Sequence, residues 1–117
     1  MTDQALAADP VQEFIASTVR DHEVVLFMKG TPDAPRCGFS SLAVQILDQV
    51  GAPFVGVDVL QDEGLRDGIK AFTDWPTIPQ LYVKGEFVGG SDIVREMFQA
   101  GELHALMAEK GVALGQD

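Results

Sequence analysis

Cys37 is the only cysteine of the 117-residue chain, and it lies in the segment PRCGFSS, residues 35–41. The apolar run before it and the helical spacing after it predict a loop-to-helix junction, where unpaired N–H groups and the helix dipole favour a negative charge. Lys29 and Arg36 precede Cys37 closely, in a chain with only eight lysines and arginines. Such cations stabilise the thiolate, the form of cysteine that reacts and binds metals. We therefore predict a functional thiolate at Cys37, with Gly38 keeping the approach to the sulfur open.

The absence of a second cysteine limits what Cys37 can do. A free cysteine is most often a small buried hydrophobic residue, and this alternative stands beside the functional one. In a redox motif with two cysteines, the second would occupy the position of Ser40. A single cysteine forms no internal disulfide, which fits a reducing compartment. The sulfur is therefore free for a partner from outside the chain.

Composition narrows the function classes. The formal net charge of −10 argues against nucleic acid and against anionic membrane surfaces as partners. No apolar run approaches the roughly 20 residues that cross a bilayer. The N-terminal residues lack the features of signal and transit peptides, so the cytosol is the expected compartment. The length predicts one domain, residues 10–112, between tails formed by residues 1–9 and 113–117.

Hydrophobic periodicity predicts an α/β fold, with a mixed sheet of about four strands and helices on both faces. Asp9 and Pro10 mark the start of the first helix, with Gln12 completing a capping box and Phe14 in the apolar stripe. The further elements are a strand at 23–28, a helix at 39–50, a strand at 53–60, a helix at 62–72, a hairpin at 80–90 and a helix at 92–110 broken near residue 101. The first two strands are predicted to be parallel, because a helix connects them.

Two segments carry a resemblance to a known family. MKGTPDAPRCGFS, residues 28–40, and WPTIPQLYVKGEFVGGSDI, residues 75–93, resemble the monothiol glutaredoxins whose active site reads Cys-Gly-Phe-Ser. The similarity extends from about residue 10 to residue 112. It implies the thioredoxin fold, with Pro79 in the cis form facing the active cysteine. Such a turn frees the backbone of Ile78 to pair with a peptide-like ligand as an added strand does.

The resemblance also implies a glutathione site. From the residues alone, Arg66 and Lys70 are a solvated helix face and Ser91 is a helix N-cap. By resemblance, Lys29 and Arg66 bind the carboxylates of glutathione, and Lys70 helps them. Many family members have a cysteine at the position of Ser91, so no disulfide with Cys37 is expected here. The implied glutathione-binding residues are Lys29, Cys37, Gly38, Phe39, Arg66, Lys70, Thr77, Ile78, Ser91 and Asp92.

The number of thiolates suggests how the protein could hold a metal cluster. A 2Fe–2S cluster usually takes four thiolates, whereas one chain supplies only Cys37. A homodimer supplies two, and a glutathione beside each Cys37 supplies the other two. The resemblance implies this same subunit-bridging cluster, with Cys37 as metal ligand, with transfer to apo iron–sulfur recipient proteins and with BolA-like partners. Neither of the two histidines has a second ligand at metal-like spacing.

Two other hypotheses use the same thiol. Cys37 suits a glutathione-dependent thiol–disulfide oxidoreductase, which removes glutathione from protein mixed disulfides without a second cysteine. A glutathione-binding redox sensor is the third hypothesis. The residues leave open whether the protein is an enzyme, and we expect an iron–sulfur carrier with at most weak oxidoreductase activity.

Overall fold

The computed structural model describes residues 9–115. Most of the predicted N-terminal tail and the last two residues of the predicted C-terminal tail lie outside the described residues, and the domain boundaries stay a prediction. At the C-terminal end of the described part, the N–H of Gly115 donates to the carbonyl of Gly51 at 2.6 Å. No helix within residues 9–115 has the length and apolar character needed to span a membrane.

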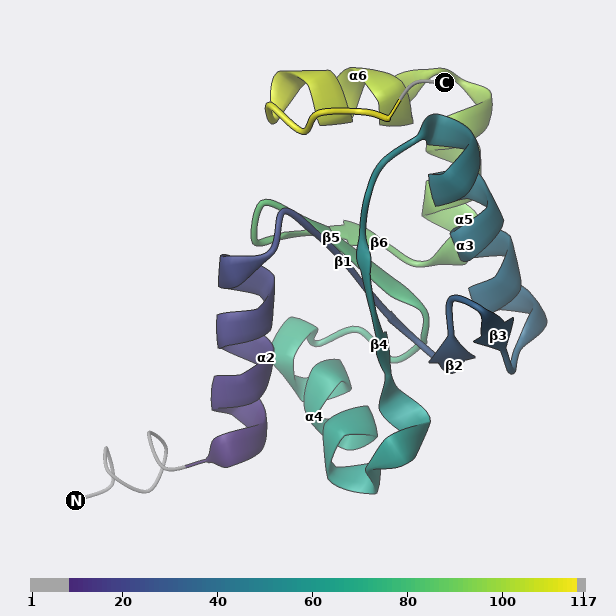
Figure 1. Ribbon diagram of the computed structural model, residues 1–117. Coiled ribbons are helices and arrows are strands. Elements are labelled where there is room, and N and C mark those ends of the chain that lie inside the picture. Colours follow the sequence, from purple (N-terminus) through teal and green to yellow (C-terminus); the bar gives the residue numbers. More distant parts are fainter. Residues whose placement is uncertain (1–8, 116–117) are drawn as a thin grey trace.

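A mixed four-stranded sheet forms the centre of the fold (Figure 1). Its strands, in spatial order, are β4 (Val55–Asp58), β1 (Val24–Met28), β5 (Gln80–Val83) and β6 (Glu86–Gly89). β1 runs parallel to β4 and antiparallel to β5, and β6 is antiparallel to β5. Lys84 and Gly85 join β5 to β6 with φ angles of 52° and 83°, the left-handed pair that tight hairpins favour. The predicted mixed sheet, its parallel pair and its hairpin are confirmed.

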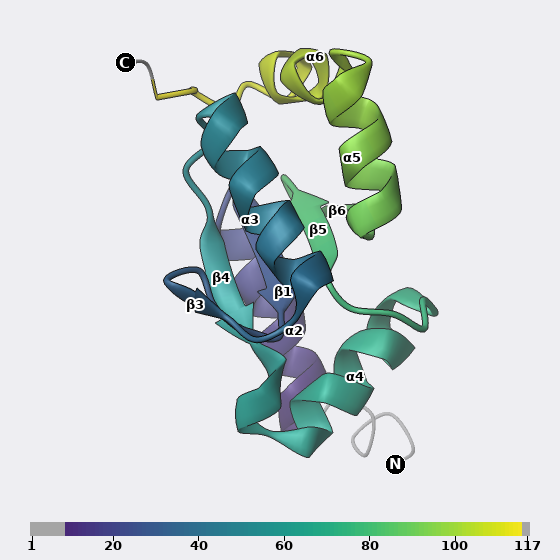
Figure 2. The same ribbon diagram turned by 90° about the vertical axis from the view of Figure 1, so that its right-hand side faces the viewer.

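Helices cover both faces of the sheet (Figures 1 and 2). α2 (Pro10–Asp21) and α4 (Glu63–Thr73) lie on one face, and α3 (Gly38–Val50), α5 (Ser91–Gln99) and α6 (Glu102–Glu109) lie on the other. Side chains alternate between the faces of a strand, so Val24, Leu26 and Met28 pack toward α3 and α5. Val25 and Phe27 pack toward α2 and α4. β1 is therefore the strand on which the two parts of the core meet.

The structure also contains short elements that the sequence did not predict. The loop before Cys37 forms a small antiparallel ribbon of β2 (Gly30–Thr31) and β3 (Ala34–Pro35). The predicted strand at 53–60 is shorter than expected, because a 3₁₀ turn, η1 (Val59–Gln61), follows β4. Strands of two residues are too short to show a hydrophobic period, which explains why the ribbon was missed.

The N-terminus of α2 is capped by one side chain only. Asp9 Oδ1 accepts the N–H groups of Val11 and Gln12 at 3.0 and 3.3 Å, as the Asp–Pro start predicted. The predicted capping box is wrong in its second half. Gln12 Nε2 donates instead to the carbonyl of Gly68 at 3.0 Å, so this side chain ties α2 to α4.

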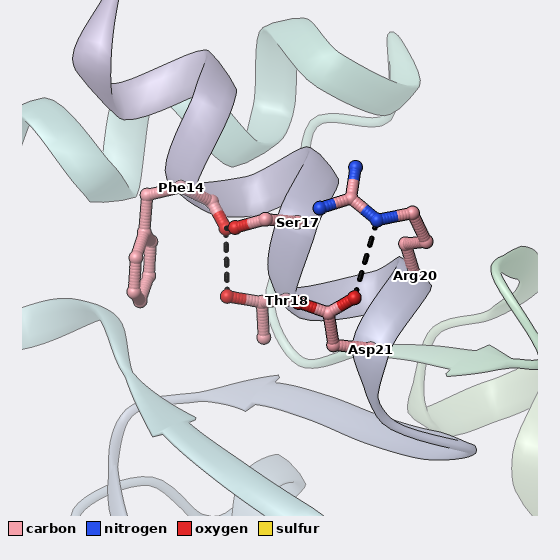
Figure 3. A network of polar contacts seen from close by, with 5 residues as sticks. All are labelled: Phe14, Ser17, Thr18, Arg20 and Asp21. Atoms are coloured by element: carbon pink, nitrogen blue, oxygen red, sulfur yellow. Dashed lines mark hydrogen bonds and ion pairs between the residues drawn. The ribbon is translucent and has the colours of Figure 1, made fainter.

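Phe14, whose carbonyl accepts two hydroxyl groups in Figure 3, does not belong to the buried stripe of α2. Ile15 and Val19 are buried, whereas 47% of Phe14 is exposed. Successive residues of a helix point about 100° apart, so a helix that buries Ile15 turns Phe14 to the edge of the contact. The hydroxyls of Ser17 and Thr18 both donate to the Phe14 carbonyl on this outer face.

Gln80 organises the turn of residues 75–79 from inside the core. Its side chain is fully buried, and its Nε2 donates to the carbonyls of Trp75 and Thr77, both at 3.2 Å. Its Oε1 accepts the hydroxyls of Thr73 at 3.0 Å and Tyr82 at 3.1 Å. Burial raises the pKa of Tyr82 to about 12, so this hydroxyl remains a donor at neutral pH. One glutamine is therefore the partner of three polar groups around the turn, and it shares the Thr73 hydroxyl with the carbonyl of Ile69.

Replacing Gln80 with Ala should lower the free energy of unfolding by about 2–4 kcal/mol, because the carbonyls of Trp75 and Thr77 and the hydroxyl of Tyr82 lose a buried partner. Urea unfolding followed by the fluorescence of Trp75, the single tryptophan, measures this loss. Gln45→Ala is the matched control, because Gln45 Nε2 donates only to Ser41 Oγ in an exposed contact, and it should cost less than about 0.5 kcal/mol. Equal losses in the two variants would contradict the role of Gln80.

Candidate functional site

Cys37 lies at the N-cap of α3, directly after the β2–β3 ribbon. Its backbone is extended, with φ −151° and ψ 138°, and its side chain is half-buried. A Cβ placed on Gly38 would have no other protein atom within 4 Å, apart from its chain neighbours and its own helix backbone. The sulfur is therefore at a helix N-terminus beside open space, as predicted, and is not part of the core.

The surroundings lower the pKa of the Cys37 thiol. The backbone N–H of Ser40 has the largest effect, and partial desolvation opposes it. The N–H of Phe39, the charge of Lys29 and the Ser40 hydroxyl lower the pKa further. The sulfur forms no capping hydrogen bond of regular geometry, so these N–H groups act as nearby partial positive charges. Lys29 is the cation that lowers this pKa, and the predicted effect of Arg36 on the thiolate stays a prediction.

Ser40 has a structural role beside its chemical one. It is fully buried, and its Oγ accepts the backbone N–H of Lys29 at 3.0 Å. This bond joins the residue after β1 to the first turn of α3, and it keeps Lys29 next to Cys37. The sequence showed Ser40 only as a missing cysteine, because nothing local indicates a hydrogen bond across the intervening ribbon.

A cleft of about 490 Å³ opens beside Cys37, within the range typical of small-molecule sites. The elements that form it are the end of β1, the start of α3, the end of α4, the turn before β5 and the start of α5. The residues that line it are Lys29, Cys37, Phe39, Lys70, Pro76, Thr77, Ile78, Pro79, Ser91 and Asp92. Eight of the ten predicted site residues therefore meet in one place.

The other two predicted residues, Gly38 and Arg66, do not line the cleft. Gly38 follows Cys37 directly, and Arg66 lies half-buried on α4, one turn before Lys70. The predicted roles of these residues as ligands stay predictions.

The turn before β5 adds two prolines to the cleft wall. Pro76 and Pro79 were not among the predicted ligands, although the WPTIP motif had singled out this turn. The Ile78–Pro79 peptide bond is cis, as the resemblance implied.

The N-terminus of α5 differs from the prediction. Gly90 is the N-cap residue, Ser91 is the first helical residue, and no side chain caps the helix. The predicted capping by Ser91 is therefore wrong. The backbone of Gly90 passes close to the turn, since a Cβ there would lie 3.4 Å from the Pro79 carbonyl oxygen. α5 begins at Ser91, one residue before the predicted start at Asp92.

The two helix N-termini at the cleft lack carboxylate caps. Neither Cys37 on α3 nor Gly90 on α5 makes a side-chain capping bond. By contrast, Asp9 caps α2 and Asp62 caps α4, both away from the cleft wall. Uncapped N–H groups at a helix start attract anions. The cleft therefore receives two partial positive charges from the backbone.

The basic residues divide into two groups of four. Arg20, Lys84, Arg95 and Lys110 each form an ion pair with a carboxylate. Within residues 9–115, the other four have no ion-pair partner within 4 Å; these are Lys29, Arg36, Arg66 and Lys70. Lys29 and Lys70 line the cleft. Arg36 directly precedes Cys37 in the sequence, and Arg66 lies one turn before Lys70 on α4. An acidic chain thus leaves unpaired the two lysines that line the cleft with Cys37, which suits an anionic ligand.

Comparison with known proteins identifies the family. The family model described as Glutaredoxin matches residues 24–88, more than half of the chain. The chain belongs to the glutaredoxin family. A relative named probable monothiol glutaredoxin 2, from Rickettsia typhi, is 49% identical to this glutaredoxin over 98 residues, which cover 84% of the chain and 88% of the relative.

A second relative is longer than this glutaredoxin. Monothiol glutaredoxin-S15, mitochondrial, from Arabidopsis thaliana is 42% identical over 111 residues, covering 95% of the chain but only 64% of the relative. The solution structure of reduced poplar apo GrxS14 is 46% identical and superposes with a TM-score of 0.79, covering 89% of this chain and 95% of that one. The predicted monothiol glutaredoxin family and its thioredoxin fold are confirmed.

Replacing Ser40 with Ala should raise the pKa of Cys37. The hydroxyl lowers this pKa directly, and it also holds Lys29, whose charge lowers the pKa. The rate of iodoacetamide alkylation, measured against pH, should shift its midpoint to higher pH. Ser41→Ala is the control, because the Ser41 hydroxyl accepts only from Gln45 Nε2, and its profile should match that of the unchanged protein. An unshifted profile for Ser40→Ala would show that the hydroxyl has no effect on the thiolate.

Proposed function

We propose that this glutaredoxin binds glutathione in the cleft beside Cys37. The observation that carries the proposal is that two unpaired lysines, two uncapped helix N-termini and the half-buried thiol of Cys37 meet in one cleft. Glutathione is an anionic tripeptide, so it matches a basic cleft that ends at a sulfur. A buckwheat glutaredoxin with the same fold, 24% identical and with a TM-score of 0.76, has been solved as a complex with glutathione.

The cleft offers a partner for each part of the tripeptide. Lys29 and Lys70 on the wall, with Arg66 one turn further on α4, would neutralise a carboxylate. At the other side, Ser91 and Asp92 open α5, whose free N–H groups suit the carboxylate of the γ-glutamyl end. The turn before β5 lies between them, and there the backbone of Ile78 would pair with the peptide.

We further propose that the protein carries a 2Fe–2S cluster as cargo between two subunits. A cluster of this type is held by four thiolates, and each chain contains only Cys37. Within residues 9–115, no group of three or more His, Cys, Asp or Glu side chains could hold a metal ion instead. Cys37 from each of two subunits and one glutathione beside each would complete the set. Phe39, which is 60% exposed next to Cys37, offers an apolar contact for the second subunit.

The same arrangement suggests the partners and the compartment. A cluster held partly by small molecules is readily passed on, so we propose apo iron–sulfur recipient proteins as its destination. BolA-like proteins are the further partners implied by the family resemblance. A lone reactive thiolate and an exposed cluster both need a reducing compartment, for which we propose the cytosol.

A second function uses the lowered pKa of Cys37. The Cys37 thiolate would attack the glutathione sulfur of a protein mixed disulfide and release the protein thiolate. A second glutathione thiolate would then attack the Cys37–glutathione disulfide, freeing Cys37 and forming glutathione disulfide. Only one protein thiol is needed, so this monothiol oxidoreductase is the alternative to the carrier.

Anaerobic reconstitution with iron, sulfide and glutathione distinguishes the two functions. We expect a brown dimer with visible absorption, formed only when glutathione is present, because two of the thiolates come from it. Cys37→Ser should give a colourless monomer. A colourless wild-type monomer that rapidly turns over glutathione mixed disulfides would instead support the oxidoreductase.

Single removal of the unpaired cations should weaken glutathione binding. We expect Lys29→Ala, Lys70→Ala and Arg66→Ala each to raise the Kd by about three- to tenfold, because each change removes an attractive charge from a partly desolvated site. Titration of the metal-free protein followed by NMR measures the Kd. Lys84→Ala is the control, because Lys84 pairs with Glu23 at the opposite end of β1, and its Kd should not change. Equal effects of Lys84→Ala and Lys29→Ala would refute the assignment of the cleft.

A further inference from the structure

The backbone around Lys29 is held by three hydrogen bonds from distant parts of the chain. The N–H of Lys29 donates to Ser40 Oγ at 3.0 Å, and its carbonyl accepts the N–H of Arg36 at 2.9 Å. The N–H of the next residue, Gly30, donates to Asp58 Oδ1 at 2.9 Å. Ser40 and Arg36 lie next to Cys37, whereas Asp58 lies at the end of β4, away from the cleft wall.

Asp58 is placed for this contact by the sheet. In the parallel pairing of β1 with β4, Asp58 lies opposite Met28, so its side chain reaches the chain as it leaves β1. The same Oδ1 accepts the N–H of Leu60 at 2.9 Å, and Oδ2 accepts Gln61 Nε2 at 3.1 Å. These contacts hold the Asp58 carboxylate against η1, and the same carboxylate also binds the N–H of Gly30 in the β2–β3 ribbon.

The ribbon itself has little freedom to move. Gly30 has a φ of +91°, and a Cβ there would lie 2.6 Å from the Ala34 carbonyl oxygen. On the other side, a Cβ on Gly56 of β4 would lie 2.5 Å from Pro32 Cγ. The ribbon is therefore packed against β4 beside the polar contact with Asp58, and the two contacts hold it to the same strand.

We propose that Asp58 is a positioning residue for the ligand of the cleft, acting through Lys29. By holding the N–H of Gly30, it fixes the direction in which the Lys29 side chain leaves the backbone and enters the cleft. Asp58 itself is not part of the cleft wall. This inference rests on the proposed binding of glutathione, and it names a residue outside the cleft that controls the affinity.

Asp58 could act through its negative charge or through the position of its hydrogen-bonding oxygens. Partial desolvation raises the pKa of Asp58, but the hydrogen bonds from Leu60, Gly30 and Gln61 and the charge of Arg36 outweigh it, so the pKa is lowered overall. The carboxylate therefore accepts hydrogen bonds in its ionised form at neutral pH. Asn keeps an oxygen at the position of Oδ1 without the charge, and Glu keeps the charge but moves it by one methylene. These two variants separate the hydrogen bonds from the charge.

The test is an NMR titration of the metal-free protein with S-methylglutathione, whose blocked sulfur neither exchanges with Cys37 nor binds iron. Asp58→Ala and Asp58→Glu should raise the Kd by about threefold or more, but by no more than Lys29→Ala does, because they weaken a charge-assisted contact that Lys29→Ala removes altogether. Asp58→Asn should stay within about twofold of wild type, because its Oδ1 still accepts the N–H groups of Gly30 and Leu60. Asp9→Ala is the control, because it removes a similar aspartate cap from α2, and its Kd should equal that of wild type.

A double-mutant cycle distinguishes positioning from general loss of stability. In a Lys29→Ala background, Asp58→Ala should have no further effect on the Kd, because the group that it positions is absent. An undiminished effect in that background would overturn the proposal, as would an Asp58→Asn variant that binds as weakly as Asp58→Ala. If Asp58→Ala does not fold, Asp58→Glu takes its place in the cycle.

Amide hydrogen exchange separates this inference from the proposed function. Asp58→Ala should speed exchange at Gly30 and Arg36, whereas Asp58→Asn should preserve protection at both. If wild type does not bind S-methylglutathione, the glutathione proposal fails, and so does the effect of Asp58 on affinity. If wild type binds but exchange at Gly30 is the same in all variants, the cleft is supported and the role of Asp58 is overturned.

Discussion

The buried hydroxyl of Ser40 accepts the backbone N–H of Lys29, and the arrangement of the site depends on this hydrogen bond. It joins the end of β1 to the first turn of α3. It therefore holds Lys29 close to Cys37 and to the N-terminus of α3. An N–H left without a partner in this part-buried position would cost roughly 1–3 kcal/mol. The small polar side chain therefore supports the site structurally while it also lowers the pKa of Cys37.

The distribution of charge follows from the same arrangement. The chain is strongly acidic, and its carboxylates neutralise the cations that lie away from the cleft. Aspartates also cap α2 and α4, whereas the helix N-termini at the cleft receive no carboxylate cap. A negative overall charge thus coexists with a locally positive site. Both proposed functions need this property, because each begins with a thiolate beside bound glutathione.

Sequence patterns determined much of this protein, because they reflect contacts that are local or periodic. The continuous apolar run of β1, the helix break near Gly101 and the Lys84-Gly85 turn each appear in the structure as the pattern indicated. The family resemblance predicted most of the residues that line the cleft, Cys37 among them. Phe14 shows the limit of periodicity, since an apolar residue at helical spacing lies at the edge of the contact and is exposed.

The tertiary structure alone decided how the cleft is held together. The buried bonds of Gln80, the tie from Gln12 to Gly68 and the contact of Asp58 with Gly30 join segments that the sequence does not mark as neighbours. It also placed Gly90, not Ser91, at the cap of α5. The sequence by itself determined the longer helices and strands, the family and the place of the single thiol, because short patterns encode them. The partners of each polar group depended on how the sheet and helices pack, because a hydrogen bond depends on distance in space and not along the chain.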